Sequence, residues 1–292
     1  MKYVFVILHY YTLDDTNKCV ESILDKGNNK NIDIIIVDNA SPNNSGNELK
    51  RIYDSKENIH IIINDKNLGF ANGNNVGFKY AKENLNPDFI IMCNNDTYLI
   101  QNNFFDLIDN EYNNSQFAVL GPKIHLQNNK INNVILKLPN LKIEKKQLRK
   151  LRIDYITNIL FLNGIYVKTK NLVKKILHKS KNNINTQADP NKRYENIVLH
   201  GCFFIFSKRY IDLFNGLDNR TFLYREEELL ALRLKNNNLL SVYNPEIEIF
   251  HNEDGATNAI SKSNRKKQLF VCKNLIKSTK VLIDELKEGG KV

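Results

Sequence analysis

The sequence predicts an α/β fold in which a mostly parallel sheet is flanked by helices, and three observations support it. Short apolar runs at residues 3–8, 32–37, 59–63 and 89–93 have the length and composition of buried strands. Segments with helical spacing of apolar residues separate these runs, at 16–24, 47–53 and 73–83. The chain has 292 residues, of which 42% are hydrophobic and 25% charged, so it can bury a sizeable core. Strands that alternate with helices in this way are typical of βαβ units.

The alternation weakens after residue 125. Apolar residues at three- and four-residue spacing then predict an amphipathic helix, at Leu148, Leu151, Tyr155, Ile159 and Leu162. Strand-like runs follow at 197–207, 239–243 and 247–250, and residues 266–286 predict a final amphipathic helix. We therefore expect four parts: the first half of the sheet domain (1–125), a basic helical insert (126–196), the second half of the sheet domain (197–260), and a C-terminal loop and helix (261–292).

The net charge of +10 is concentrated in one segment. Residues 142–181 contain twelve Lys or Arg and two acids, Glu144 and Asp154, so the rest of the chain is neutral in sum. A nucleic-acid-binding protein would carry its charge as a stripe with base-reading or stacking residues, and no such motif accompanies this segment. No nucleic acid partner is therefore expected. The basic segment has two interpretations: a solvated helical pair, or a surface that docks on anionic lipid.

Cysteine usage and hydropathy indicate the compartment. The four cysteines are scattered without a CxxC pair, which argues against a zinc site or a disulfide framework and fits a reducing environment. The first residues, MKYVFVILHYY, lack a cleavage-site pattern, and no stretch approaches the roughly 20 apolar residues that span a bilayer. We expect a cytoplasmic protein, peripheral on the inner face of the cell membrane if the basic segment binds lipid.

Polar side chains come directly after three of the predicted strands. They follow the first, second and fourth strand in turn: His9 and Tyr11, then Asp38 and Asn39, then Asn94, Asn95 and Asp96. In parallel sheets, ligands sit beyond the carboxyl ends of the strands. A lone Asp at such an end is as often a helix cap. Together with its Asn neighbours, however, Asp96 favours a sugar-nucleotide diphosphate held through Mg²⁺ or Mn²⁺, since both ions prefer oxygen ligands.

A second polar cluster, NLGFANGNN, occupies residues 67–75. Glycine allows a close backbone approach to a ligand, and the N-terminus of the following helix favours anions. The candidate ligand contacts are Asn67, Gly69, Phe70 and Asn74. The alternative is an Asn-rich turn with no binding role. The cluster does not match GxGxxG, so a dinucleotide-dependent dehydrogenase is not supported.

Three acids follow the sequence FLYR, namely Glu226, Glu227 and Glu228. Acids at a helix start often only complement the helix dipole. Because successive helical residues diverge by about 100°, at most two of them can face one site, where a carboxylate could act as a general base. His251 ends a short apolar run and is either structural or a metal ligand through an imidazole nitrogen.

Five segments taken together resemble family 2 glycosyltransferases, and more narrowly the rhamnosyltransferase-like bacterial enzymes that build capsule, O-antigen and related glycans. These segments are VDNASPNNS, NLGFANGNN, CNNDT, GLDNRTFLYREEELLALR and HNEDGAT. The likeness covers residues 3–125 and 197–275. It implies a GT-A fold, a Rossmann-like sheet whose first half binds the nucleotide sugar and whose second half carries the acceptor and catalytic residues.

The resemblance also implies a donor and metal site. Asp38 falls on the position that recognises the nucleotide base or ribose. The family's Asp-x-Asp motif falls on Asn94, Asn95 and Asp96, so Asp96 is expected to bind the metal while Asn94 replaces an acid. His251 matches the histidine that completes the metal site.

For catalysis, the family's Glu-Asp pair falls on Glu226 and Glu227, which makes Glu227 the expected base. Glutamate stands here where aspartate is usual, and Leu229 replaces a later Asp of the motif, with Glu228 displaced from it. The choice among the three neighbouring acids therefore stays open at this point.

The implied activity is inverting transfer of a sugar from a dTDP- or UDP-linked donor, with rhamnose suggested by the resemblance. The acceptor would be a hydroxyl of a growing surface glycan or of a polyprenyl-diphosphate-linked oligosaccharide. The alternative is a catalytically inactive protein of the same fold that binds a sugar nucleotide or glycan. Lys262, Arg265 and Lys266 are expected on a loop that could fold over the diphosphate.

Overall fold

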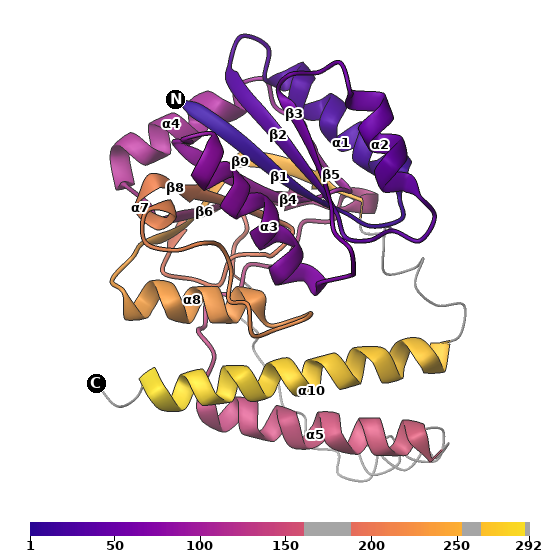
Figure 1. Cartoon of the computed structure of the whole chain (residues 1–292). Coiled ribbons are helices and arrows are strands. Elements are labelled where there is room, and N and C mark those ends of the chain that lie inside the picture. The colour runs from indigo at the N-terminus through magenta and orange to yellow at the C-terminus, as the bar shows by residue number, and fades with distance from the viewer. Residues whose placement is uncertain (161–187, 253–263, 290–292) are drawn as a thin grey trace.

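The computed structural model describes residues 1–160, 188–252 and 264–289 and shows a central sheet between helices (Figure 1). The strands are β1 (Lys2–His9), β2 (Asn31–Asp38), β3 (Ile59–Ile63), β4 (Phe89–Asn94), β5 (Thr97–Leu99), β6 (Val119–His125), β7 (Tyr194–Glu195), β8 (Phe203–Ser207) and β9 (Ser241–His251). Their order in the sheet is β3-β2-β1-β4-β8-β6-β9-β5, with β7 paired to β9.

The sheet has a parallel half and a mixed half. Strands β3, β2, β1 and β4 are parallel, as their alternation with helices predicts. Strand β8 runs antiparallel between β4 and β6, whereas β6 and β9 are parallel. Strands β5 and β7 are antiparallel to β9. The predicted α/β fold with a helix-flanked sheet is confirmed, and the antiparallel pairs bring the later part of the chain to the end of β4.

Helices cover both faces of this sheet. They are α1 (Leu13–Lys26), α2 (Ser45–Tyr53), α3 (Gly69–Asn84), α4 (Phe104–Ser115), α5 (Leu141–Ile159), α7 (Lys208–Ile211), α8 (Glu226–Asn236) and α10 (Asn264–Glu288), with a short 3₁₀ helix, η1 (Gln127–Asn129). Helices α1, α2 and α4 pack on one face, and α3, α7 and α8 pack on the other.

Burial on both faces explains why the early strands are continuously apolar. In β2, Ile34 and Ile36 belong to one hydrophobic cluster, whereas Ile35 and Val37 belong to the cluster on the other face. Side chains of a strand alternate between faces, so a strand covered twice needs an apolar residue at every position.

Helices α5 and α10 form a pair at the edge of the molecule, and Figure 1 shows them side by side below α8. Leu282 of α10 is buried against Leu229 and Leu232 of α8, which joins the pair to the sheet domain. The N-terminal half of the basic segment lies on α5. Residues 161–181 of that segment lie outside the described residues.

The structure corrects the predicted bounds of the later strands. The expected strand 197–207 begins only at Phe203, and the residues before it make a single bridge, between Val198 and Ile135. The two strands expected at 239–243 and 247–250 are one strand, β9, which passes an irregularity opposite Pro122 and Lys123.

The C-terminal helix also begins earlier than expected. Arg265 and Lys266 lie in α10 and not in a loop, because Arg265 donates to the backbone oxygens of Asn158 and Ile159 at the end of α5. Lys262 lies outside the described residues. In the part of the chain that is described, no helix combines the length and apolarity required to cross a bilayer.

Candidate functional site

The candidate site lies where several strand ends meet. Parallel pairing sets His9 beside Asp38 and Leu8 beside Asn94, so β1, β2 and β4 end at one edge of the sheet. At the same edge, the N–H of Asn94 donates to the carbonyl of Cys202, just before β8, over 2.9 Å. Residues that lie far apart in the sequence, around positions 94 and 202, are therefore neighbours at this edge.

Asp96 and His251 are in direct contact although 155 residues separate them. Antiparallel pairing of β5 with β9 sets Thr97 opposite His251, and the N–H of Asn252 donates to the carbonyl of Asp96 over 2.9 Å. As a result, Nε2 of His251 lies 3.1 Å from Oδ1 of Asp96, and both side chains are buried. The other imidazole nitrogen, Nδ1, is buried without a hydrogen-bond partner among the described residues.

This pair suits a divalent cation that also binds substrate. A carboxylate oxygen and an imidazole nitrogen are compatible with Mn²⁺ and Mg²⁺, and such ions often complete their shells with phosphate oxygens and water. Across residues 1–160, 188–252 and 264–289, no group of three or more His, Cys, Asp or Glu side chains could hold a metal. Asp96 and His251 would therefore supply two protein ligands to such an ion.

Glu227 lies in the same region. It is the second residue of α8, and its Oε1 accepts a hydrogen bond of 3.1 Å from the N–H of Gly201. The preceding residue, His200, has its ring 6.3 Å from the ring of His251. Consecutive contacts therefore lead from Glu227 through residues 200–201 to His251 and Asp96, and the three residues proposed from the sequence share one edge of the sheet.

The three acids at the start of α8 have different surroundings. Glu226 is buried and accepts a hydrogen bond of 3.0 Å from Thr221, and burial raises its pKa to about 7. Glu228 forms an ion pair with Arg225. Only Glu227 contacts the strand end at Gly201. Burial raises the pKa of Glu227, the charge of Glu228 adds to this effect, and the Gly201 N–H opposes it.

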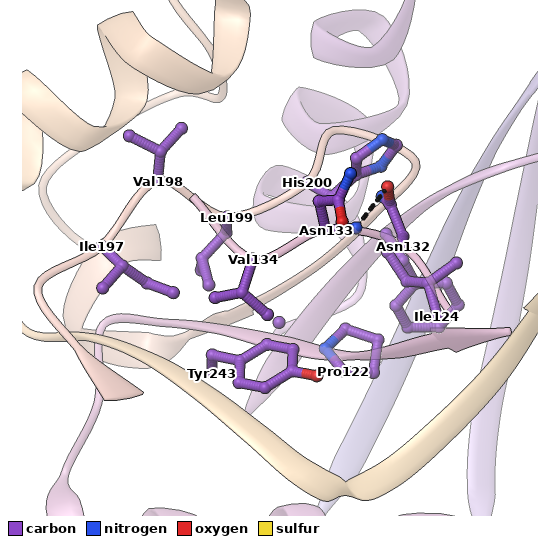
Figure 2. A pocket seen from close by; sticks show the side chains of 12 residues that line it. Pro122, Ile124, Asn132, Asn133, Val134, Ile197, Val198, Leu199, His200 and Tyr243 are labelled. Carbon is purple, nitrogen blue, oxygen red and sulfur yellow. Dashed lines mark hydrogen bonds between the residues drawn. The ribbon is translucent and has the colours of Figure 1, made fainter. Parts of the chain in front are cut away.

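His200 is a site residue that the sequence interpretation missed. The N–H of Cys202 donates to its Nδ1 over 3.2 Å, and burial lowers the pKa of His200 to about 4, so the neutral ring carries its proton on Nε2. The signal for it was present, because His200 and Gly201 interrupt the apolar run IVLHGCFFIFS. Figure 2 shows His200 at one end of a small pocket, near Asn132 and Asn133.

Two predicted ligand contacts lie beneath the surface. His9 is fully buried, and its ring nitrogens lie 2.7 Å from the hydroxyls of Thr16 and Ser45. The amide of Asn95 points to the start of α1 and donates to Thr12 and Thr16. Both side chains hold the ends of β1 and β4 to neighbouring helices, and these hydrogen bonds use both ring nitrogens of His9 and the amide nitrogen of Asn95.

Asp38 and Asn39 organise the adjoining loops. The Asp38 carboxylate is 2% exposed and accepts from the N–H of Ser41. Asn39 is also buried, and its amide donates to the side chain of Asn67 and to the carbonyl of Gly69. These bonds hold the start of α3 against the end of β2. A base or ribose contact by Asp38 would need this loop to open.

The NLGFANGNN cluster is joined to the FLY segment by the backbone. The N–H of Phe70 donates to the carbonyl of Phe222 over 2.8 Å, and Gly69 has a φ of +81°. Asn74 is buried and donates to the carbonyl of Phe70, while its Oδ1 is without a partner among the described residues.

Four of the predicted donor contacts keep exposed surface. They are Tyr11, Asn67, Phe70 and Asn94. These four residues are the most accessible of the ten predicted donor contacts and are therefore the first candidates to contact a ligand.

Comparison with known proteins gives a family and a fold. Residues 4–214 match the family described as Glycosyl transferase family 2. A curated relative, the low-salt glycan biosynthesis hexosyltransferase Agl10 of Haloferax volcanii, is 26% identical over 92 residues, which are 32% of this chain and 28% of that protein.

Two crystal structures of S. aureus TarS share the architecture at 13% identity. The structure of TarS residues 1–349 has a TM-score of 0.52, over 86% of this chain and 60% of that one. A second TarS structure has a TM-score of 0.54, over 86% of this chain and 37% of that one. The chain thus spans under a third of the hexosyltransferase and at most 60% of the TarS chains. At this identity the likeness concerns the GT-A fold alone. Since the family match covers well over half of its residues, the chain belongs to glycosyl transferase family 2.

Proposed function

We propose that this glycosyltransferase moves a sugar from a nucleoside-diphosphate donor to an acceptor hydroxyl, with inversion at the anomeric carbon. The observation that carries the proposal is the succession of neighbours from Glu227 through Gly201 and His200 to His251 and Asp96 at one sheet edge. It sets a carboxylate of raised pKa beside a pair of side chains suited to a metal and a diphosphate.

In the proposed reaction, Glu227 accepts the proton of the acceptor hydroxyl while that oxygen attacks the anomeric carbon. The bond from this carbon to the diphosphate oxygen breaks, and its electrons leave with the nucleoside diphosphate. A single displacement from the opposite side inverts the configuration. A raised pKa helps the carboxylate to accept a proton.

Asp96 and His251 are the residues that would hold Mn²⁺ or Mg²⁺. Such an ion would offset the negative charge that grows on the departing diphosphate. Asn94 keeps exposed surface next to Asp96 and is proposed to contact the ribose or the sugar.

We propose a hexose or deoxyhexose as the transferred sugar. The name of the curated relative, a hexosyltransferase of glycan biosynthesis, supports this size of sugar. A dTDP- or UDP-linked donor is proposed, with rhamnose as the first sugar to test. The acceptor is proposed to be a surface glycan of the capsule or O-antigen type, or a polyprenyl-diphosphate-linked precursor.

Contact with the cytoplasmic face of a membrane is also proposed, through α5. The exposed side of this helix combines Lys145, Lys146 and Arg149 with Ile153 and Ile156, which are 47% and 53% exposed. A helix that presents cations and apolar side chains together suits an anionic lipid surface.

The proposed function is tested by nucleotide binding and sugar transfer. A thermal-shift screen of UDP, dTDP and their sugars, with and without Mn²⁺, should raise the melting temperature for one donor, because a ligand that binds the folded state stabilises it. With that donor, Glu227→Gln should lower kcat by about 10²- to 10⁴-fold, the range for general-base catalysis. Asp96→Asn should weaken the Mn²⁺-dependent part of the shift.

The matched control is Glu57→Gln, since Glu57 is an exposed glutamate before β3. It should transfer sugar like the parent. Full activity of Glu227→Gln would overturn the assigned base. A parent protein that binds the donor without hydrolysis or transfer would favour the inactive sugar-nucleotide-binding alternative.

A further inference from the structure

The backbone just before α8 has an unusual conformation. Tyr224 and Arg225, two successive residues that are not glycine, have φ values of 75° and 74°. Left-handed conformations are unfavourable for such residues and persist only when the surroundings enforce them. The carbonyl of Arg225 then accepts the N–H of Leu229, which starts the first turn of α8. The direction in which the Glu227 side chain points from α8 therefore depends on this two-residue turn.

A buried ion pair with α5 holds the turn. The guanidinium of Arg225 donates to Glu144 over 3.1 Å and also pairs with Glu228. The side chains of Arg225 and Glu144 are only 11% and 7% exposed. A buried charge is costly unless it is paired, so each partner strongly favours the conformation in which the two meet.

Helix α10 fixes the residue before the turn. The hydroxyl of Ser278 donates to the carbonyl of Leu223 over 2.8 Å. Since α5 and α10 pack together, the helical pair contacts the segment before α8 at Leu223 and Arg225, and also at Arg220, which pairs with Glu285 of α10. Glu144 is the contact that comes from the basic segment, where all but one of the other charged residues are cations.

We infer that Glu144 is a positioning residue for catalysis: through Arg225 it fixes the left-handed turn that aims Glu227 at the strand end beside Gly201. This inference rests on the proposed role of Glu227 as the base. It assigns α5 a part in the reaction, although α5 lies outside the sheet that supplies the other site residues.

Three variants of the full chain test the inference. Glu144→Gln keeps the shape and one acceptor oxygen but removes the charge, and Glu144→Asp keeps the charge on a shorter side chain. Arg225→Asn removes the ion pair but tolerates the left-handed backbone. A matched control is Asp154→Asn, the other acid of the basic segment, on the same helix.

We expect Glu144→Gln and Arg225→Asn each to lower kcat by about tenfold to a hundredfold, the effect of misplacing a catalytic group by about 1 Å. The KM for the donor should stay within about twofold of the parent, because the proposed donor contacts lie on other elements. Combining the two changes should add little to the larger single effect, since both remove the same interaction. Glu144→Asp should recover part of the activity, and Asp154→Asn should match the parent.

A role in stability alone would give a different result. Lower melting temperatures with kcat within about twofold of the parent for both Glu144→Gln and Arg225→Asn would overturn the inference, as would independent effects that multiply in the double variant. If Glu144→Gln does not fold, the kcat of Glu144→Asp is compared with that of the parent instead. A value within about twofold of the parent, together with a lower melting temperature, would then overturn the inference. Loss of activity in Glu227→Gln with normal activity in Glu144→Gln would reject this inference and leave the proposed function standing.

Discussion

Adjacent carboxylates at the start of α8 lie in different environments because successive helical residues point about 100° apart. Glu226 turns into the core toward Thr221, whereas Glu227 turns to the strand end at Gly201. Burial disfavours the charged carboxylate and outweighs its hydrogen bonds from the backbone and from Thr221, so the pKa of Glu226 lies above that of a free glutamate. Its effect should therefore be visible in the pH dependence of stability.

We predict that Glu226→Gln reduces the pH dependence of the unfolding free energy between pH 4.5 and 7. The pKa of Glu226 is raised from 4.5 to about 7 in the folded state, so the folded protein binds more protons than the unfolded chain in this window. Stability from this group is then greatest at low pH and falls as the pH rises, by up to about 3 kcal/mol. Urea unfolding of both proteins at pH 5 and pH 7.5 measures the difference. If the unfolding free energy changes equally between these two pH values in the parent and in the variant, the prediction is contradicted.

The sequence predicted Asp96, Glu227 and His251 as candidates because motif residues and strand ends are local signals. The resemblance implied that Asp96 and His251 lie close together, but local signals could not predict their contact, since it depends on how β8 and β9 pair with β4 and β5. Glu144 and Arg225 were missed for the same reason, being 81 residues apart. The burial of His9 and Asp38 could not be predicted from the sequence either, because a polar residue at a strand end can face either the solvent or the neighbouring helix.

At the scale of elements, helix α3 begins four residues before the start predicted from its apolar spacing. The prediction placed the start at Gly73, because the preceding residues were interpreted as an Asn- and Gly-rich loop. In the structure the helix begins at Gly69, where Asn67 accepts the N–H of Gly69 and Phe222 accepts the N–H of Phe70. A tertiary contact thus fixes the start of α3 and docks it on the segment that leads to α8.

We predict that Gly69→Ala separates these two segments. A Cβ at this position would lie 2.1 Å from the carbonyl oxygen of Phe222, and the φ of +81° disfavours any residue with a Cβ. The expected destabilisation is about 2 to 4 kcal/mol, measured by urea unfolding, together with weaker donor binding.

Gly289→Ala serves as the control for this change. Its new Cβ would meet only the flexible side chain of Asn236, at 3.2 Å. We expect an effect within about 0.5 kcal/mol for it. A similar loss in both variants would show that the Phe222 contact is not responsible.

At the scale of the whole molecule, charge is distributed unevenly. The sheet domain, residues 1–125 and 197–260, contains 17 Lys or Arg against 25 Asp or Glu and is acidic, whereas α5 carries six cations from the basic segment, and its exposed side also displays isoleucines. The net charge of +10 therefore does not represent the charge of every surface of the protein. The sequence predicted the clustering of cations on this segment. It did not predict the exposure of Ile153 and Ile156, since their spacing would also suit the buried face of a helix.

We predict that the protein floats with vesicles that contain about 30% phosphatidylserine and stays behind with neutral vesicles. Changing Lys145, Lys146 and Arg149 together to Gln should lower the partition coefficient between vesicles and water by roughly a hundredfold. Each cation near an anionic surface contributes about 1 kcal/mol to binding. Raising the salt concentration should have a similar effect.

A triple variant on another surface controls for total charge. Lys50, Arg51 and Lys66 are exposed and lie on or near α2 and β3, away from α5. Changing them to Gln should leave flotation unchanged. A parent protein that remains in the soluble fraction with both kinds of vesicle would rule out the membrane contact.

Pairing of β5 with β9 has a consequence for biosynthesis. Asp96 and His251 meet only through this ladder, and 155 residues separate them. A nascent chain emerging from the ribosome displays Asp96 long before its histidine has been translated. The growing polypeptide therefore cannot form the contact between Asp96 and His251 until β9 has left the exit tunnel, and every translation product that ends before His251 lacks it.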